Sequence, residues 1–257
     1  MLSTNKIKHI RSLGSKKYRI AEGLFIAEGE KLVMEMLDSE FSVTYIAGTK
    51  DWFEKQNKQT LNQCKEQDVV NQKELDRLSF QKTPQNVLCV AKLPNYQLNF
   101  EELKNELTLV LDNVQDPGNL GTILRVADWF GIGHIICIED TADAFNPKVV
   151  QSTMGAICRV KTYYEDFETL LPKIKSLGLP LYGTTLDGEN VYNTPLANEG
   201  LIMMGNESKG INAQWIKMLD KKLMIPFYPE KKKRSESLNV AIASAIVCAE
   251  FRRRQSA

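Results

Sequence analysis

Three short stretches of the sequence carry side chains that could do chemistry together. They read LVLDNVQDPGNLGTILRVADWFG (residues 109–131), MMGNESKGI (203–211) and SESLNVAIASAI (235–246). Together they supply side-chain amides, a guanidinium, a carboxylate and a hydroxyl, which are groups that bind and orient phosphates and nucleotides. The residues that carry these groups are Asn119, Arg125, Glu207, Ser237 and Asn239.

The first stretch predicts a buried strand, a tight turn and a helix that opens on glycines. Asp116 can cap this helix, and Pro117 suits its first turn because that position needs no N–H. Gly121 and Arg125 are four residues apart and share a helix face, so an anion could approach open backbone and meet the guanidinium. Arg125 could instead pair with Asp128 on a wet surface. A glycine-rich turn alone is weak evidence for a nucleotide-binding site, and the G-x-G-x-x-G fingerprint of dinucleotide-binding proteins is absent.

The second and third stretches each allow a functional and a structural interpretation. Glu207 lies between two glycines, in a loop that could bind a ligand or be an ordinary exposed turn. Ser237 is a plausible N-cap of the last helix, and Asn239 beside it is either satisfied by backbone or functional. Residues 238–249 are apolar nearly all round, which predicts a helix buried in the core or against a second subunit.

All three stretches follow predicted strands of an α/β fold. From about residue 105 strands and helices alternate, which favours a mostly parallel sheet. Ligands of such sheets bind beyond the carboxyl ends of the strands, where the three stretches fall. Residues 1–95 read as a separate small α/β domain and residues 96–104 as a linker, which leaves 105–257 as the C-terminal domain.

Composition indicates an ordinary globular protein. The chain has 257 residues, of which 43% are hydrophobic and 25% charged. No apolar run approaches the roughly 20 residues of a membrane span, and the first residues lack the apolar core of a signal peptide, so we expect a cytoplasmic protein that does not contact membranes. The five cysteines are scattered singly, so we expect no metal site and no disulfide framework.

A net charge of +1 conceals three basic clusters. Clustered cations favour a polyphosphate partner such as nucleic acid, because neutralised phosphates release counterions. For the C-terminal triplet, residues 252–254, we expect a solvated chain end and not a nucleic-acid contact. The residues of the other two clusters, for which we predict nucleic-acid contacts, are Lys6, Lys8, Arg11, Lys16, Lys17, Arg19, Lys231, Lys232, Lys233 and Arg234.

In order, the patterns NxxDPGNxGxxxRxAxxFG, MGNESKG and IP…SLNVAIASAI resemble the three motifs of the SpoU (TrmH-like) RNA 2′-O-ribose methyltransferases of the SPOUT superfamily. The resemblance covers residues 105–255, and three ordered motifs are far more specific than any one of them. It implies a C-terminal domain with a deep trefoil knot, a homodimer formed through knot-region helices, and S-adenosylmethionine as the cofactor. The N-terminal unit resembles the substrate-binding domain related to ribosomal protein L30e, which favours ribosomal over transfer RNA.

The resemblance also implies roles for individual residues. Asn119, Arg125, Glu207, Ser237 and Asn239 match the polar motif positions that are expected to be catalytic. The family assigns activation of the ribose hydroxyl to the arginine, here Arg125. A guanidinium with a pKa above about 12 is a poor base, so we expect it to orient the substrate phosphate and hydroxyl. The positions implied to line the cofactor are Thr184, Thr185, Gly205, Ile225 and Leu238.

Several alternatives stay open. The same chemistry could act on transfer RNA, although smaller relatives that do so often lack an N-terminal domain. The chain could be an RNA-binding or ribosome-assembly factor that has lost catalysis, or a generic nucleotide-binding domain, which would explain the turns but not three motifs. Residues 227–236 form a longer segment than the usual glycine turn of the family, which puts the cofactor contacts there in doubt. Its cations could grip RNA.

Overall fold

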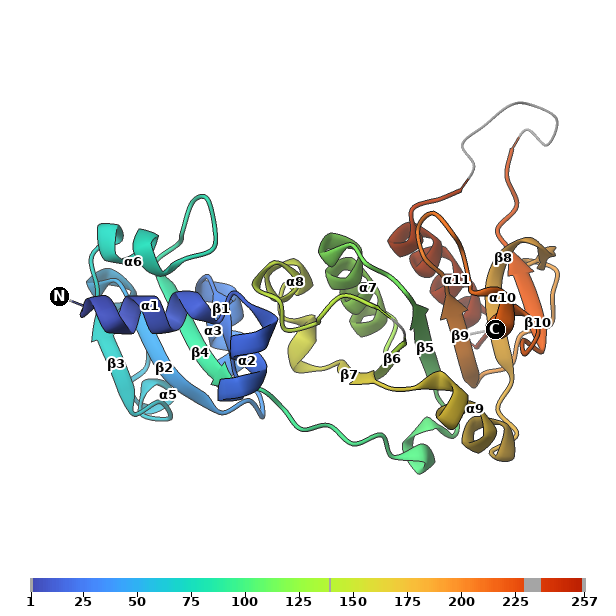
Figure 1. Ribbon diagram of the computed structural model, residues 1–257, viewed down its shortest axis with the longest axis horizontal. Helices are drawn as coiled ribbons and strands as arrows, with labels where there is room; N and C mark the ends of the chain where they lie inside the picture. Colours follow the sequence, from blue (N-terminus) through green and yellow to red (C-terminus); the bar gives the residue numbers. More distant parts are fainter. Residues whose placement is uncertain (1, 139, 229–236, 256–257) are drawn as a thin grey trace. The chain divides into compact units, whose positions relative to one another are not determined.

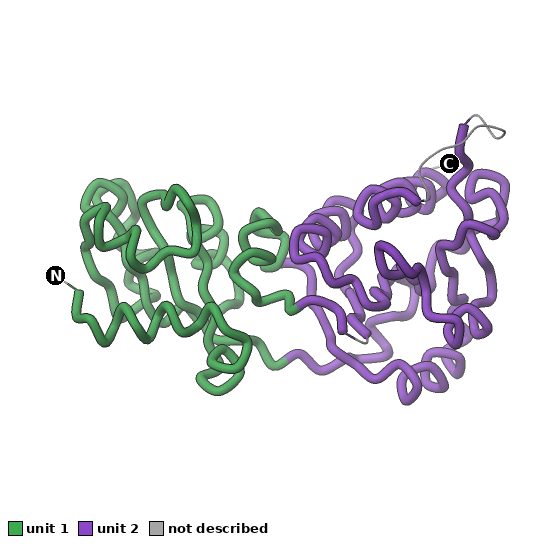
Figure 2. The backbone as a smooth tube through the Cα atoms, turned by 45° about the horizontal axis from the view of Figure 1, so that its top comes forward, with its two compact units in different colours: residues 1–95, 143–158 green, residues 96–142, 159–257 purple. Residues whose placement is uncertain are grey.

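The computed structural model describes residues 2–138, 140–228 and 237–255. The chain forms two compact units, one of Met1–Asn95 with Asp143–Cys158 and one of Tyr96–Ala142 with Arg159–Ala257 (Figure 2). The second unit therefore starts where we expected the linker to start. The segment Asp143–Cys158 lies with the first unit, although the sequence pattern led us to expect it in the C-terminal domain.

The first unit is built on a four-stranded sheet with the order β1-β4-β2-β3. β4 is antiparallel to β1 and β2, whereas β2 and β3 are parallel. Apolar side chains of α1, α6 and the strands form its core. The elements are α1 (Thr4–Ser12), α2 (Lys16–Glu22), β1 (Leu24–Glu28), α3 (Glu30–Leu37), β2 (Val43–Gly48), α4 (Lys50–Lys55), α5 (Lys58–Leu61), β3 (Glu66–Val69), α6 (Gln72–Leu78) and β4 (Val87–Lys92).

Local sequence explains where α6 begins. The Asn71 side chain accepts a hydrogen bond from the Glu74 N–H at 3.0 Å, and the Glu74 carboxylate accepts one from the Asn71 N–H at 3.1 Å. This capping box satisfies two N–H groups that have no partner within the helix.

The segment Asp143–Cys158 joins the first unit through α8 (Pro147–Thr153) and the turn before it. The Phe145 ring lies edge-on against Phe25 of β1, with the ring centroids 4.9 Å apart. Phe25 is fully buried, so this aromatic contact stabilises the position of the segment within the first unit.

The second unit is built on a six-stranded sheet with the order β10-β8-β9-β5-β6-β7 (Figure 1). Every pair of neighbouring strands in it is parallel, which confirms the predicted α/β fold with a mostly parallel sheet. The strands are β5 (Leu107–Asp112), β6 (His134–Ile138), β7 (Lys161–Tyr164), β8 (Leu181–Asn190), β9 (Gly200–Met204) and β10 (Lys221–Met224). The helices are η1 (Phe100–Leu103), α7 (Pro117–Trp129), α9 (Phe167–Ser176), α10 (Ala213–Ile216) and α11 (Val240–Gln255), and η2 (Ala156–Cys158) belongs to the first unit.

The middle strands β9, β5 and β6 are buried along their whole length. Their sequences are almost continuously apolar, as expected for parallel strands that are covered on both faces. Side chains of α9 and α10 pack with Val110, Ile136 and Met203 on one face of the sheet. α7 and α11 pack against each other. This core fixes the strand ends from which the three motif stretches emerge.

α11 is buried on one face only. Val240, Val247 and Phe251 are buried, whereas the side chain of Ile242 is 55% exposed. Complete burial in the core is therefore wrong, because only one stripe of this apolar helix faces the rest of the chain, and burial against a second subunit stays a prediction. None of the described helices is long and apolar enough to cross a membrane.

The C-terminal arginine triplet is bound to protein groups. Arg252 Nε donates to the carbonyl oxygen of Phe130 at 2.7 Å, at the end of α7. Arg253 and Arg254 lie 2.8 and 2.6 Å from the carboxylate of Glu250. The hydrogen bond from Arg253 is the largest cause that lowers the pKa of Glu250 to about 2. The predicted solvated end is wrong for Arg252 and Arg254, which tie α11 to the rest of the unit.

Candidate active site

The three motif stretches meet at one edge of the second sheet. β5 and β9 are neighbours and point the same way, so their carboxyl ends lie side by side (Figure 1). β5 leads into the turn before α7, and β9 leads into the loop that carries Glu207. The polar residues of both stretches therefore leave the sheet at the same edge, as the topology of parallel sheets predicts.

Asn119 connects the three stretches by hydrogen bonds. Its Nδ2 donates to Glu207 Oε1 at 2.9 Å, and its Oδ1 accepts from Asn239 Nδ2 at 2.8 Å. One member of this chain of bonds comes from each stretch, which residue spacing alone could not show. We call Asn119, Glu207 and Asn239 the polar bridge. It fixes the beginnings of α7 and α11 against the loop after β9.

Helix capping positions the polar bridge. The Asp116 carboxylate accepts from the N–H of Asn119 at 2.8 Å, as predicted for the N-cap of α7. At α11 the cap is Asn239, whose Oδ1 accepts from the N–H groups of Ala241 and Ile242 at 3.0 and 3.3 Å. The predicted N-cap Ser237 is wrong, because α11 begins only at Val240 and the capping position precedes it.

The loop after β9 is closed on itself by Asn206, which we did not predict as a site residue. Asn206 and Gly210 exchange two backbone hydrogen bonds of 3.0 Å. The Asn206 Oδ1 accepts from the N–H groups of Ser208 and Lys209, and its Nδ2 donates to the Asn113 carbonyl at 2.8 Å. The only sequence signal was an asparagine directly after a strand and before a polar loop, which is a common turn-forming position.

Arg125 is exposed and does not belong to the polar bridge. Asp128, its possible partner in the sequence, instead forms a two-pronged ion pair with Arg159, with N–O distances of 2.8 and 2.9 Å. Within the part of the chain that the structure describes, no carboxylate lies within ion-pairing distance of Arg125. A fixed positive charge is thus available to a ligand about one and two-thirds helical turns beyond Asn119.

Of the five predicted cofactor residues, two lie in the middle of β8, two directly follow β9 and β10, and one lies just before α11. Thr184 and Thr185 belong to β8, where the Thr184 hydroxyl donates to the carbonyl oxygen of Met203 in β9 at 3.4 Å. Gly205 follows β9 and Ile225 follows β10. Leu238 directly precedes Asn239 of the polar bridge.

These residues fit a cofactor that is held by backbone groups and apolar contacts. The Leu238 side chain is 51% exposed although it is apolar, and Ile225 is half-buried. Among the described residues, no hydrogen bond engages the backbone of Leu238. An exposed apolar side chain can pack against the face of an adenine ring. Backbone groups without hydrogen bonds can bind the polar edge of the ring, as in most cofactor sites.

Gly205 has a structural reason to be glycine. A Cβ atom at this position would lie 2.6 Å from the carbonyl oxygen of Gly210 and closer still to backbone atoms of Gly210 and Ile211. The end of β9 and the end of the following loop therefore touch through their main chains. Only a residue without a side chain permits this approach.

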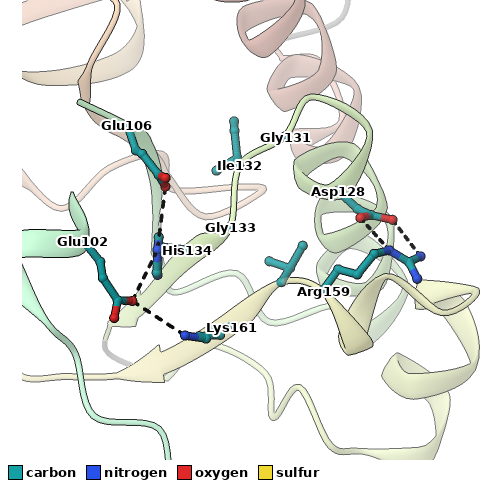
Figure 3. A pocket seen from close by; sticks show the side chains of 10 residues that line it. Glu102, Glu106, Asp128, Gly131, Ile132, Gly133, His134, Arg159 and Lys161 are labelled. Atoms are coloured by element: carbon teal, nitrogen blue, oxygen red, sulfur yellow. Dashed lines mark hydrogen bonds and ion pairs between the residues drawn. The ribbon is translucent and has the colours of Figure 1, made fainter. Parts of the chain in front are cut away.

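A separate cavity of about 470 Å³ lies at the opposite edge of the sheet, where β6 and β7 begin (Figure 3). Its wall includes His134, whose Nε2 lies 3.8 and 3.7 Å from carboxylate oxygens of Glu102 and Glu106. Burial is the largest influence on His134 and lowers its pKa, although the two carboxylates act in the other direction. No member of the polar bridge lines this cavity, so it does not mark the chemistry of the motifs.

Two of the six basic residues predicted in the N-terminal arm are engaged at the surface of the first unit. Lys6 Nζ lies 2.7 Å from carboxylate oxygens of both Glu66 and Asp68. The Arg11 guanidinium lies over the Phe80 ring, 4.3 Å from its centroid. An RNA phosphate would have to compete with these contacts.

Arg19 is buried, with 1% of its surface exposed. Its guanidinium donates to the carbonyl oxygens of Leu13 and Gly14 at 2.8 Å each, and to the Asp143 carboxylate at 2.6 Å. A buried cation is stable only when it is paired in this way. The prediction that Arg19 contacts nucleic acid is therefore wrong, and this residue holds the Asp143–Cys158 segment in the first unit.

The remaining predicted cations divide into two groups. Lys8, Lys16 and Lys17 are exposed on α1 and α2. The second cluster, residues 231–234, lies outside the described residues, so the prediction for it stays a prediction.

Comparison with known protein families gives two matches. Residues 106–249 match the SpoU rRNA Methylase family, and residues 4–89 match the MRM3-like substrate binding domain. Over 248 residues the chain is 31% identical to the 23S rRNA (guanosine(2553)-2'-O)-methyltransferase RlmP of Bacillus subtilis. That alignment covers 96% of each protein.

Solved structures resemble the whole chain. A protein of Porphyromonas gingivalis assigned to the TrmH family of RNA methyltransferases is 40% identical, with a TM-score of 0.87 over 99% of both chains. An AdoMet-bound rRNA methyltransferase of Sinorhizobium meliloti is 28% identical, with a TM-score of 0.86 over 99% of this chain and 96% of that one. Each of these two proteins thus contains counterparts of both units in a single chain.

Proposed function

The chain belongs to the SpoU rRNA methylase family, and we infer that it is an S-adenosylmethionine-dependent RNA 2′-O-ribose methyltransferase that acts on ribosomal RNA. The observation that carries this inference beyond family membership is the polar bridge, which joins all three motifs through Asn119. A protein that had lost catalysis would have no need to keep this arrangement of amides and carboxylate, which argues against a purely binding function.

The reaction requires placement more than strong acid–base chemistry. S-adenosylmethionine supplies a methyl group on a positively charged sulfur, and the ribose 2′-hydroxyl must approach it in line and lose its proton. Holding two reactants in such a geometry contributes up to about 7–11 kcal/mol to the lowering of a barrier. We propose that Asn119 and Glu207 place the nucleotide and that Arg125 orients its phosphate and hydroxyl.

The residues that we propose for cofactor binding lie near the edge of the sheet where the three motif stretches meet. We propose that the backbones of Gly205, Ile225 and Leu238, with Thr184 and Thr185 beside them, hold S-adenosylmethionine. This assignment is supported by the half-exposed Leu238 side chain, by the positions of Gly205 and Ile225 directly after β9 and β10, and by the hydrogen bond from Thr184 of β8 to Met203 of β9. Ser237, which is exposed and one residue before Leu238, remains a proposed catalytic residue.

Ribosomal RNA is favoured over transfer RNA by the Bacillus subtilis relative, whose name specifies 23S rRNA and whose alignment covers 96% of this chain. We propose that residues 4–89 bind the substrate, supported by the match to a substrate-binding domain and by the exposed Lys8, Lys16 and Lys17. The proposed site of action is where ribosomes are assembled, which in a bacterial cell is the cytoplasm. A trefoil knot in the second unit stays a prediction.

We further propose that the protein is a homodimer formed through α7 and α11. These helices pack together and carry unusually exposed apolar side chains, with Trp129 85% and Ile242 55% exposed. Large apolar side chains that are exposed on neighbouring helices mark candidate interaction surfaces. Arg125 lies one helical turn before Trp129 on the same face, so it would sit at the dimer interface and its position would depend on the partner copy.

Replacing Trp129 with glutamate should therefore convert the dimer into a monomer, because it puts a charge into a desolvated apolar contact. Analytical ultracentrifugation measures the change, and we expect methyl transfer to fall at least about tenfold with it. Val69→Glu is the matched control, since Val69 is 63% exposed on β3 of the other unit. A wild-type protein that sediments as a monomer would remove the dimer from the proposal.

The function itself is tested by methyl transfer in vitro. The protein is incubated with S-adenosylmethionine labelled in its methyl group and with ribosomal RNA from cells that lack the protein. We expect label at a single nucleotide whose 3′ linkage resists alkaline hydrolysis, because a 2′-O-methyl group removes the hydroxyl that attacks the phosphate. Label on a base, or cofactor binding without any transfer, would contradict the proposed reaction.

A further inference from the structure

The loop after β9 carries a lysine, Lys209, to which the motif resemblance gave no role. Lys209 lies at the tip of the closed loop 206–210, two residues after Glu207 of the polar bridge. Its N–H donates to the Asn206 Oδ1 at 3.0 Å, so the backbone that carries the side chain is fixed. Gly210 closes the loop in the left-handed conformation, with φ of +70°.

The Lys209 side chain itself is uncommitted. It is exposed, and within residues 2–138, 140–228 and 237–255 no carboxylate lies within 4 Å of its ammonium group. Lys6 differs, because two carboxylates at 2.7 Å bind it. A cation on a rigid backbone, without an internal partner, loses little interaction energy when it binds an external anion.

The anion available at this edge is the backbone of the substrate. Glu207, which shares the loop, accepts a hydrogen bond from Asn119, and the proposed function places the target nucleotide beside these two residues. A lysine is a compact point charge that tolerates the variable approach of phosphate oxygens. Side-chain contacts to phosphates set the register of a nucleic acid on a protein without reading its sequence.

We propose that Lys209 is a positioning residue that binds a phosphate of the RNA backbone next to the target ribose. The proposal rests on the function proposed above and adds to it a substrate contact by a residue of the second motif stretch to which the resemblance gave no role. The loop thereby has two connected tasks. Glu207 joins the polar bridge on its inner side, and Lys209 fixes the register of the RNA on its outer side.

Lys209→Ala and Lys209→Arg test this proposal against Lys217→Ala. Lys217 is the matched control, because it is also an exposed lysine of the second unit but follows α10 rather than the motif loop. The substrate is ribosomal RNA from cells that lack the protein. Binding is measured between about 50 and 200 mM salt, and kcat and KM are measured for methyl transfer.

We expect Lys209→Ala to raise KM about three- to tenfold with kcat reduced less, and arginine to restore most of the loss. The slope of log affinity against log salt should fall by about 0.7–0.9, the change for one lost phosphate contact. Lys217→Ala should leave both quantities unchanged. If Lys209→Ala matches Lys217→Ala, Lys209 has no such role. If the wild-type protein transfers no methyl group, the proposed function fails instead, whatever the variants do.

Discussion

Arg125→Ala should abolish methyl transfer to RNA while S-adenosylmethionine still binds. The guanidinium is exposed, has no described ion-pair partner and lies on the helix that begins with Asn119. Its removal should leave the fold intact, together with the cofactor residues in β8 and directly after β9 and β10. Loss of a fixed charge that stabilises a reacting group typically costs about 10²- to 10³-fold in kcat. Steady-state transfer rates and calorimetry with the cofactor measure the two effects separately.

Arg159→Ala is the control for this substitution. Arg159 is also a partly exposed guanidinium of the second unit, but it is paired with Asp128 away from the polar bridge. We expect it to cost some stability and to change kcat by less than about threefold. Near-normal turnover in Arg125→Ala would remove this residue from the catalytic set. Loss of cofactor binding in the same variant would assign it to a different role.

Gly205→Ala should destabilise the second unit and weaken cofactor binding together. The added methyl group would collide with the main chain of Gly210 and Ile211, and backbone cannot rotate away as a side chain can. Overpacking of a well-packed site costs about 1–3 kcal/mol and occasionally more, and the backbone contact places this case at the upper end. We expect a lower Tm in thermal unfolding and a Kd for S-adenosylmethionine raised at least about tenfold.

Gly133→Ala provides the comparison. Among the described residues, no heavy atom beyond Gly133 and its two chain neighbours lies within 4 Å of the position that its Cβ would occupy, and its φ is outside the left-handed region. This substitution should be neutral or slightly stabilising, because alanine restricts the unfolded chain more than glycine does. If Gly205→Ala unfolded at the same temperature as Gly133→Ala and bound cofactor normally, the close approach of the two backbone segments would be irrelevant to the site.

Features that depend on short stretches of sequence were predictable. The capping box of Asn71 and the Asp116 cap of α7 each involve residues three positions apart. The parallel sheet followed from alternating apolar strands and helices, and the convergence of the motifs followed from the rule that parallel strands end at one edge. These interactions are set by local spacing, which the sequence contains directly.

Features that depend on distant partners were not predictable. Arg19 read as one cation of a basic arm, but its partner Asp143 lies 124 residues further along the chain. Arg252 read as a solvated end, but it binds the carbonyl oxygen of Phe130, which only the packing of α11 on α7 brings near. Ser237 read as the N-cap of the last helix, but α11 begins at Val240 and Asn239 caps it. Tertiary packing made each of these choices.

The most direct test of the central claim is a map of ribose 2′-O-methylation in all cellular RNA, with and without the protein. We predict that its loss removes methylation from one nucleotide of ribosomal RNA and that the wild-type gene restores it, whereas the gene encoding Arg125→Ala does not. An unchanged ribosomal RNA map would contradict the account. So would methylation lost only from transfer RNA.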